Sequence, residues 1–329
     1  MKAWLLDSIG AGVGGLRLGE VPDPQPGPGE AVLELHYAAL NPADRYLAEG
    51  QYPAKPAIPH ILGRDGFGTV AAVGADVRDV RVGDRRAVLR GETGVSKPGT
   101  FARRVVVPAQ DLVEAPPSWS EAESASATLV YLTALQALNQ WGELPPSVVL
   151  ITGASGGVGV AATQLGAALG HTIIGLSRSE EKAKRLRELG AAAVFDPENA
   201  DWRKQLKEFL KDKRVDLAID NIGGPLFADV IETLGMWGKV SVVGRLAGPV
   251  PDFNTSTLLF RRIRIGGVAV GTYSNPEART AWQKIMNLLS RTGAKPLVDH
   301  VFKFAELPQA FDRLKHGPMG KVVIDVKSA

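Results

Sequence analysis

The chain lacks cysteine altogether and has only five histidines among its 329 residues. Without cysteine there can be no disulfide bond, no thiolate nucleophile and no cysteine-ligated zinc ion. The histidines stand far apart, with no pair spaced as in the HExxH motif: His36, His60, His171, His300 and His316. These absences predict a protein without a catalytic metal.

Long apolar runs and a strong charge excess are missing too. No apolar run approaches the ~20 residues that a membrane helix needs, and the opening MKAWLLDSIGAGVGG does not resemble a signal peptide. The net charge is only +3, and the basic residues are spread along the chain rather than gathered as nucleic-acid binding requires. We therefore expect a cytoplasmic protein that acts neither on a membrane nor, as its main function, on nucleic acid.

What the chain does contain is typical of a globular protein, with 45% hydrophobic and 22% charged residues. Its length favours two domains over a single core. In the first third, residues 31–40, 68–74 and 101–109 have the pattern of strands, separated by turns rich in glycine and proline. Closely spaced short strands predict a barrel-like or sandwich-like domain. The Ala- and Leu-rich residues 121–142 then predict one or two helices.

A strand–helix rhythm follows. Its strands begin with SVVLITG, HTIIGLS, AAVF and VDLAIDNIGG and continue with KVSVVG and RIRIGGVAV, and helical patterns separate the first four. This alternation predicts a doubly wound parallel sheet. After about Ala294 the pattern becomes strand, helix, strand, and the closing strand does not continue the rhythm.

The strongest motif is VVLITGASGGVGVAATQLG, in which glycines fall at Gly153, Gly156, Gly157 and Gly159 between a strand and a helix. Glycines allow the tight turn, the close approach of a pyrophosphate and the packing of helix on strand. The helix N-terminus adds free N–H groups and a partial positive charge. This context predicts a dinucleotide site, although a glycine turn used only for packing is the alternative.

The end of the following strand indicates which dinucleotide is bound. NAD-selective sites place Asp or Glu there, whereas this chain has Ser177, Arg178 and Ser179, with Lys182 one helical turn further on. Arginine and hydroxyl groups can hold a 2′-phosphate. NADPH is therefore the expected cofactor, unless Arg178 is simply a solvated surface residue.

Six motifs in this order resemble the medium-chain dehydrogenase/reductases, specifically their zinc-free quinone oxidoreductase (zeta-crystallin-like) branch. They are NPADRYLAEGQYP, GRDGFGTVAAVG, LITGASGGVG, SRSEEKAKRLRELGA, VDLAIDNIGG and LPQAFDRLKHGPMGKVVI. The resemblance covers nearly the whole chain. It also has departures. Zinc-bearing relatives have a Cys near Asn41 and a His near Arg64, and this chain has neither there. Asp65 stands where the branch often has Glu, and Pro197 where some NADPH users have Tyr.

The resemblance implies a GroES-like β-barrel catalytic domain (1–119 and 297–329) and a Rossmann NADP(H)-binding domain (120–296), with the active site between them. It also implies a homodimer, for which we nominate the edge segment RRIRIGGVAV, residues 261–270. The residues implied in cofactor binding are Thr133, Gly153, Ser155, Gly156, Gly157, Val158, Gly159, Ser177, Arg178, Ser179, Lys182, Asn221, Val243 and Gly244.

Hydride transfer to a conjugated acceptor requires positioning and a proton or hydrogen-bond donor rather than a metal. Tyr52 is the first choice of donor, because enoyl thioester reductases of the superfamily are similar in this turn. Tyr46 and Asn41 are the other candidate catalytic residues. The alternatives are that Tyr52 packs on Pro53 and that Asn41 only forms a turn. Asp44 is expected to cap the helix DRYLAEG.

The expected function is therefore an NADPH-dependent reductase of quinones or activated α,β-unsaturated carbonyl compounds. One alternative is an enoyl-thioester reductase acting on CoA or carrier-protein substrates. Such substrates call for basic residues at the cleft mouth, which Arg45, Lys55, Arg64 and Arg90 could provide. The other is a low-turnover NADPH-binding protein with a structural or regulatory role.

Overall fold

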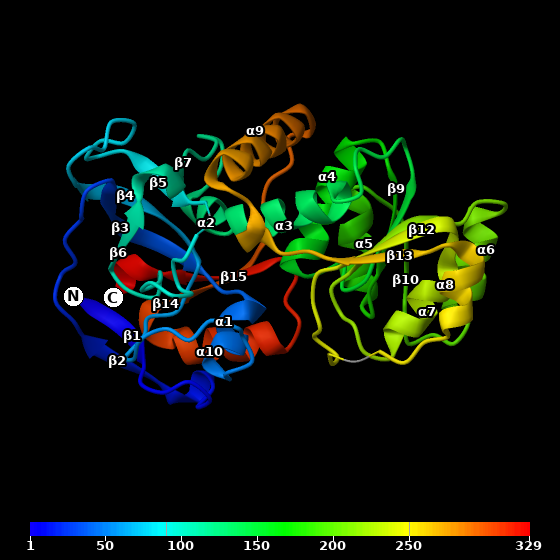
Figure 1. Ribbon diagram of the computed structural model, residues 1–329, viewed down its shortest axis with the longest axis horizontal. Helices are drawn as coiled ribbons and strands as arrows, with labels where there is room; N and C mark the ends of the chain where they lie inside the picture. The colour runs from blue at the N-terminus through cyan, green and yellow to red at the C-terminus, as the bar shows by residue number, and fades with distance from the viewer. Residues whose placement is uncertain (90, 250) are drawn as a thin grey trace. The chain divides into compact units, whose positions relative to one another are not determined.

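The computed structural model describes residues 1–89, 91–249 and 251–329 (Figure 1). The chain divides into two compact units. The first contains Met1–Leu129, Tyr273–Thr280 and Lys295–Ala329, and the second contains Val130–Thr272 and Ala281–Ala294. The first unit thus continues past the expected boundary at 119, into helix α3 (Thr128–Asn139), and it adds the start of helix α9 (Asn275–Thr292).

The first unit is built on a seven-stranded sheet in the order β14-β15-β3-β4-β5-β7, with β6 also paired to β3. All its pairs are antiparallel except β14–β15. Its strands are β3 (Glu30–Ala39), β4 (Asp65–Val73), β5 (Arg85–Val88), β6 (Arg104–Pro108), β7 (Leu112–Val113), β14 (Val298–Lys303) and β15 (Lys321–Asp325). The three strands predicted in the first third of the chain are confirmed as β3, β4 and β6.

Shorter elements complete this unit. A separate antiparallel pair joins β1 (Lys2–Leu6) and β2 (Leu16–Glu20). Its helices and 3-10 turns are η1 (Val13–Gly15), α1 (Pro42–Ala48), η2 (Ala109–Asp111), α2 (Glu121–Ala125), η4 (Phe304–Glu306), α10 (Leu307–Lys315) and η5 (Val326–Ser328). Ser120 and Glu123 cap α2 reciprocally, the Ser120 hydroxyl accepting from the Glu123 N–H at 3.1 Å.

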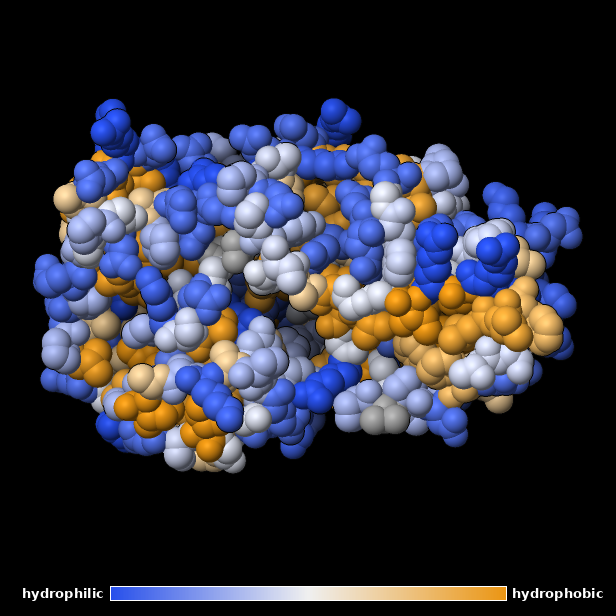
Figure 2. All heavy atoms as spheres, viewed as in Figure 1, coloured by the Kyte–Doolittle hydropathy of each residue, from blue (hydrophilic) through white to orange (hydrophobic). Residues whose placement is uncertain are grey.

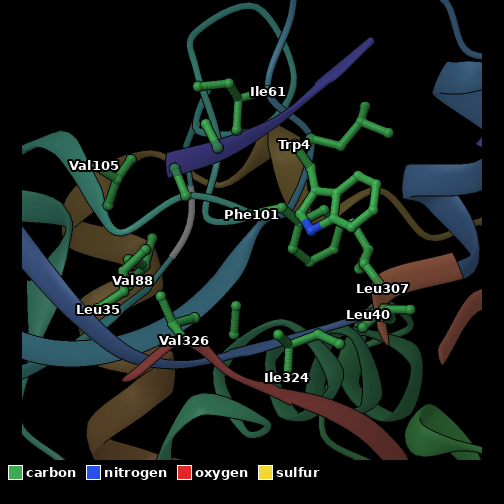
Figure 3. Packing of buried hydrophobic residues seen from close by; sticks show 14 of the residues in the cluster. Trp4, Leu35, Leu40, Ile61, Val88, Phe101, Val105, Leu307, Ile324 and Val326 are labelled. Atoms are coloured by element: carbon green, nitrogen blue, oxygen red, sulfur yellow. The ribbon is translucent and has the colours of Figure 1, made fainter. Parts of the chain in front are cut away.

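The core of the first unit joins the two ends of the chain (Figure 3). The Trp4 indole N–H donates to the carbonyl of Phe304 at 2.9 Å, and the rings of Phe101 and Phe311 meet edge to face at 5.9 Å. Strand β15 pairs antiparallel with β3, with Ile324 opposite Ala38. The closing strand therefore returns to the first domain, as the resemblance implied.

The second unit is a six-stranded parallel sheet in the order β10-β9-β8-β11-β12-β13. In chain order this is 3-2-1-4-5-6, so the predicted doubly wound sheet is confirmed, and its switch point lies between β8 and β11. The strands are β8 (Val148–Ile151), β9 (Thr172–Leu176), β10 (Ala191–Phe195), β11 (Val215–Asp220), β12 (Leu234–Val242) and β13 (Arg264–Gly267). The helices and one 3-10 turn are α4 (Gly157–Ala168), α5 (Glu180–Glu188), α6 (Trp202–Leu210), α7 (Leu226–Thr233), α8 (Thr255–Arg261) and η3 (Val270–Thr272).

The sequence patterns used above did not identify α7, α8 or α9, the last of which has 18 residues. A signal for α9 was present. Ser274 precedes the helix, and both its N–H and its hydroxyl donate to Glu277 at 2.7 Å. The apolar positions Ala278, Trp282, Ile285, Leu288 and Leu289 recur at helical spacing, and all are buried.

Candidate cofactor and catalytic sites

The glycine-rich turn has the conformation that a dinucleotide site requires. Gly153 directly follows β8 and Thr152 and has φ +56°, in the left-handed region that favours glycine. A Cβ atom at Gly159 would lie 2.5 Å from the carbonyl oxygens of both Gly153 and Ala154, so no side chain fits between helix and turn. Gly156, in contrast, would place a Cβ no nearer than 3.5 Å to any neighbour.

Helix α4 opens directly after this turn, with Gly156 as its N-cap. Among the described residues, no side chain caps it and no acidic residue stands in its first turn. Ser155, Gly156, Gly157 and Val158 are all partly exposed. The first N–H groups of α4 are thus left to bind an anion, and the helix dipole favours one.

The switch point is held together by hydrogen bonds that join β8 to β11. The Thr152 hydroxyl donates to the Asp220 carboxylate at 2.7 Å, and the backbone N–H of Asn221 donates to that hydroxyl at 2.9 Å. The Asn221 amide donates to the Thr152 carbonyl at 2.8 Å. Val243 and Gly244, which follow β12, both donate to the Asp220 carbonyl. The predicted cofactor residues Asn221, Val243 and Gly244 therefore lie at the carboxyl ends of neighbouring strands.

Sequence reasoning missed Thr152 and Asp220, which anchor this arrangement. Asp220 is fully buried, and its carboxylate accepts from the N–H of Gly223 at 3.0 Å. The available signal was position, because each residue lies at the carboxyl end of a buried strand near the switch point.

The end of β9 carries the residues predicted to select the cofactor. Ser177 is nearly buried, and the hydroxyl of Ser179 caps α5 by accepting from the Lys182 N–H at 3.4 Å. Arg178 is 71% exposed and forms an ion pair with Glu198 at 3.2 Å. The side chains of Arg178 and Lys182 can hold a 2′-phosphate, with Glu198 competing for Arg178. Thr133 lies on α3, half-buried.

In the first unit, Asp65 is the centre of a buried polar cluster. It is 1% exposed, and its carboxylate accepts from the Lys321 ammonium at 3.0 Å, the Asn41 amide at 3.0 Å and the Thr128 hydroxyl at 3.0 Å. The Leu129 N–H at the start of α3 adds a bond of 3.2 Å. Asp65 is therefore a structural hydrogen-bond acceptor.

Asn41 is part of the same cluster. Its side-chain oxygen accepts from Lys321 at 2.6 Å while its side-chain nitrogen donates to Asp65. Lys321, only 4% exposed, was missed because nothing in its neighbourhood of the sequence marks it as a partner of Asp65. Asn41 is also the N-cap of α1. The helix begins two residues earlier than predicted, at Pro42, because proline suits the first position of a helix.

Asp44 links this cluster to a second cation. Its carboxylate accepts from the backbone N–H of Asn41 at 2.8 Å, and it lies 3.7 Å from the Nε of Arg64. Asp44 is fully buried, and burial raises its pKa to about 6, with the Arg64 guanidinium partly opposing the rise. Asp44 therefore caps α1 as expected, through its bond to the Asn41 N–H, although it is the third residue of the helix and Asn41 is the N-cap.

The two candidate tyrosines have different surroundings. Arg64 Nη1 donates to the Tyr52 hydroxyl at 3.1 Å, and the guanidinium carbon lies 4.4 Å from the centre of the Tyr52 ring. The ring of Tyr46 lies 5.2 Å from the Arg45 guanidinium, and its hydroxyl oxygen is buried. The structure thus connects Asn41 and Tyr52 through Asp44 and Arg64. The roles of Asn41, Tyr46 and Tyr52 toward a substrate stay predictions.

Two protein-family models match the chain. One, described as the alcohol dehydrogenase GroES-like domain, matches residues 27–117, and the other, described as zinc-binding dehydrogenase, matches residues 157–291. Mouse quinone oxidoreductase is 26% identical over 306 residues, covering 92% of this chain and 90% of that protein. Acryloyl-coenzyme A reductase of Sulfurisphaera tokodaii is 26% identical over 334 residues, covering 94% and 96%.

A solved structure of a mycobacterial protein complexed with NADPH superposes with a TM-score of 0.88 at 26% identity, covering 98% of this chain and 99% of that one. The fold, the switch-point turn and these relatives define a two-domain oxidoreductase. The chain belongs to the medium-chain dehydrogenase/reductase superfamily, which confirms the resemblance seen in its motifs. The expected combination of a GroES-like and a Rossmann domain is confirmed as well.

One family description names zinc, but this chain does not supply the ligands of such an ion. The chain has no cysteine, and within the part of the chain that the structure describes no three His, Asp or Glu side chains are placed to hold a metal ion. Beside Asn41, near which zinc-bearing relatives have a cysteine, the Lys321 ammonium already lies against Asp65 and Asn41. These residues do not fit a catalytic zinc ion.

No helix within the described ranges has the length and apolarity to span a membrane.

Proposed function

We propose that this protein is an NADPH-dependent, zinc-independent reductase that transfers hydride to quinones or activated α,β-unsaturated carbonyl compounds. The observation that carries the proposal is the glycine turn at the switch point, together with Arg178 and Lys182, which follow the end of the next strand in place of an acid. Relatives described as a quinone oxidoreductase and an acryloyl-coenzyme A reductase support the two substrate classes. The NADPH-bound structural relative supports the cofactor.

The residues divide the work between the two units. NADPH, when bound, supplies the hydride. The N–H groups at the start of α4 bind the pyrophosphate, while Gly153 and Gly159 keep the turn close to the helix. Arg178 and Lys182 bind the 2′-phosphate. Tyr52 donates a proton or hydrogen bond to the substrate atom that receives negative charge, because a phenol is neutral and protonated at pH 7.

An enoyl-thioester reductase is the second candidate, favoured by the match to the acryloyl-coenzyme A reductase over nearly both full lengths. Only some of the four basic residues that the sequence suggested for binding a thioester substrate remain candidates. Arg64 is mostly buried against Asp44 and Tyr52, and Arg90 lies outside the described residues, which leaves Arg45 and Lys55. The third hypothesis is that the protein binds NADPH but has little turnover.

The test is oxidation of NADPH and NADH with an ortho-quinone, a para-quinone, a trans-2-enal and a trans-2-enoyl-CoA. Tyr52→Phe and Tyr46→Phe are assayed beside the wild type. Turnover with quinones or the enal supports the main proposal, and turnover only with the enoyl-CoA supports the second candidate. Tight NADPH binding without turnover of any acceptor would favour the binding protein.

We also propose that the cytoplasmic form is a homodimer joined at the edge of the second unit's sheet. Strand β13 is the last in the sheet order, so one side of it has unpaired N–H and C=O groups. Figure 2 shows an apolar band over the part of this unit that carries α8 and β13. Leu259 and Phe260 are 72% and 75% exposed, and Trp237 and Ile265 are also exposed.

Sedimentation velocity tests the proposed dimer. The wild type should sediment as a dimer and Phe260→Glu as a monomer. Val82→Glu, a substitution at an exposed site of the first unit, should sediment as a dimer like the wild type.

A further inference from the structure

Arg64 is a largely buried cation between an acid and the candidate proton donor. Its side chain is 12% exposed, and its Nε lies 3.7 Å from Asp44 Oδ1. Its Nη1 donates to Tyr52. The remaining nitrogens, Nε and Nη2, are buried and make no hydrogen bond with the described residues. Burying a guanidinium is costly unless it is paired and hydrogen-bonded, and Asp44 and Tyr52 are the partners of Arg64 here.

The chemistry of the two groups fixes the direction of their hydrogen bond. A guanidinium has only donors, so the Tyr52 oxygen must be the acceptor. A phenol carries one proton, and within the described ranges no side chain or carbonyl accepts it from Tyr52. This proton is therefore left for donation to a group outside the protein chain.

Arg64 also affects Tyr52 after the phenol has lost its proton. Loss of the proton leaves a phenolate 3.1 Å from a guanidinium nitrogen, so that a hydrogen bond from a cation to a neutral oxygen becomes a hydrogen bond between opposite charges, which is stronger. Arginine stays protonated in proteins, so it cannot compete as the acid. Asp44 is the group that holds Arg64 in place, because it lies at ion-pair distance and is itself fixed by the Asn41 N–H.

We propose that Arg64 is a positioning residue for Tyr52: it orients the phenol so that its proton faces the substrate, and it stabilises the phenolate that remains. The inference rests on the proposed function. With an unsaturated carbonyl substrate, hydride from NADPH adds with its electron pair to the β-carbon, and the C=C electrons shift to give an enolate. Tyr52 protonates that enolate, and the phenolate then regains a proton from water. With a quinone, the same proton goes to the quinone oxygen.

The experiment is a double-mutant cycle of Arg64→Gln and Tyr52→Phe, measured as kcat and KM with the best acceptor of the panel. A positioned acid contributes roughly 10²–10⁴-fold to the rate. Because Arg64→Gln removes only the positioning of that acid, we expect it to lower kcat by about tenfold to a hundredfold, with little change in KM. In the Tyr52→Phe background the same substitution should cause almost no further loss of kcat, because its target is gone. Arg64→Lys should restore part of kcat, since an ammonium can still donate to the phenol.

Folding and cofactor binding are checked separately. Arg86→Gln is the matched control: Arg86 is a similarly buried arginine of the first unit, paired with Asp84 at 2.8 Å, and contacts none of the candidate residues. The dissociation constant for NADPH and the unfolding midpoint are measured for every variant. A fall in kcat only as large as that of Arg86→Gln, or an undiminished loss in the Tyr52→Phe background, would overturn the inference. A wild type without turnover would instead refute the proposed function.

Discussion

The two units prepare their candidate sites by opposite means. The second unit uses backbone: glycines, an uncapped helix N-terminus and carbonyls and N–H groups tied at the switch point. The first unit uses charged side chains taken out of water, with Lys321 and Arg64 set against Asp65 and Asp44. A site made of backbone is sensitive to added volume, whereas a buried charge cluster is sensitive to the loss of any one partner. Substitutions should therefore fail for steric reasons in one unit and electrostatic reasons in the other.

The largest effect should come from removing the cation of the first unit. Lys321→Met leaves Asp65 as a buried carboxylate without its ion-pair partner, which typically costs about 3–5 kcal/mol. The free energy of unfolding in urea measures this. Lys284→Met is the control, because its pair with Glu143 is exposed and should contribute under ~1 kcal/mol. Equal losses of unfolding free energy in the two variants would mean that burial does not increase the contribution of the Lys321–Asp65 pair to stability.

A pH-dependent effect should follow from Asp44. Because its pKa is about 6 in the folded protein and ~3.9 in an unfolded chain, the folded state binds more protons between these values. Its contribution to stability therefore falls as pH rises from about 4 to 6, by up to ~3 kcal/mol. Asp44→Asn removes this titration, so the stability of the variant relative to the wild type should rise over that interval. A difference that is constant from pH 4 to 7 would contradict the assignment.

Two glycines in the same turn should separate packing from ligand binding. Gly159→Ala puts a Cβ 2.5 Å from two carbonyl oxygens and should destabilise the protein by about 1–3 kcal/mol. Gly156→Ala meets nothing nearer than 3.5 Å, so stability should change by less than ~0.5 kcal/mol while NADPH affinity falls. Thermal unfolding and fluorescence titration measure the two effects. Loss of stability in Gly156→Ala would show that this glycine serves packing.

The smallest effect should appear at the exposed end of the cofactor site. Glu198→Gln removes the acid paired with Arg178 and frees the guanidinium for a 2′-phosphate. Because exposed ion pairs are worth ~0–1 kcal/mol, NADPH affinity should rise by no more than about fivefold. NADH affinity should not change, which provides an internal control. Arg178→Gln should weaken NADPH binding alone, and equal weakening of both cofactors would remove Arg178 from 2′-phosphate recognition.

The second unit could be predicted from sequence in most respects because its signals are local. The rhythm of strands and helices, the turn around Gly153 and the residues after β9 are each contained within a short stretch of sequence. The helices α7 to α9 were missed although α9 carries a capping signal at Ser274. In the first unit, Tyr52 and Asn41 could be nominated, but their partners could not. The link from Tyr52 to Arg64 depends on a turn conformation, and that from Asn41 to Lys321 spans 280 residues.

The late position of Lys321 has a consequence for the order of events during synthesis. Asp65 and Lys321 are separated by 256 residues, and β15, which carries Lys321, pairs with β3 near the beginning of the chain. While the ribosome translates the intervening residues, the second unit can be completed, but the first unit has a carboxylate in its interior and no cation to meet it. The nascent first unit therefore cannot reach its final stability until the last strand has left the exit tunnel.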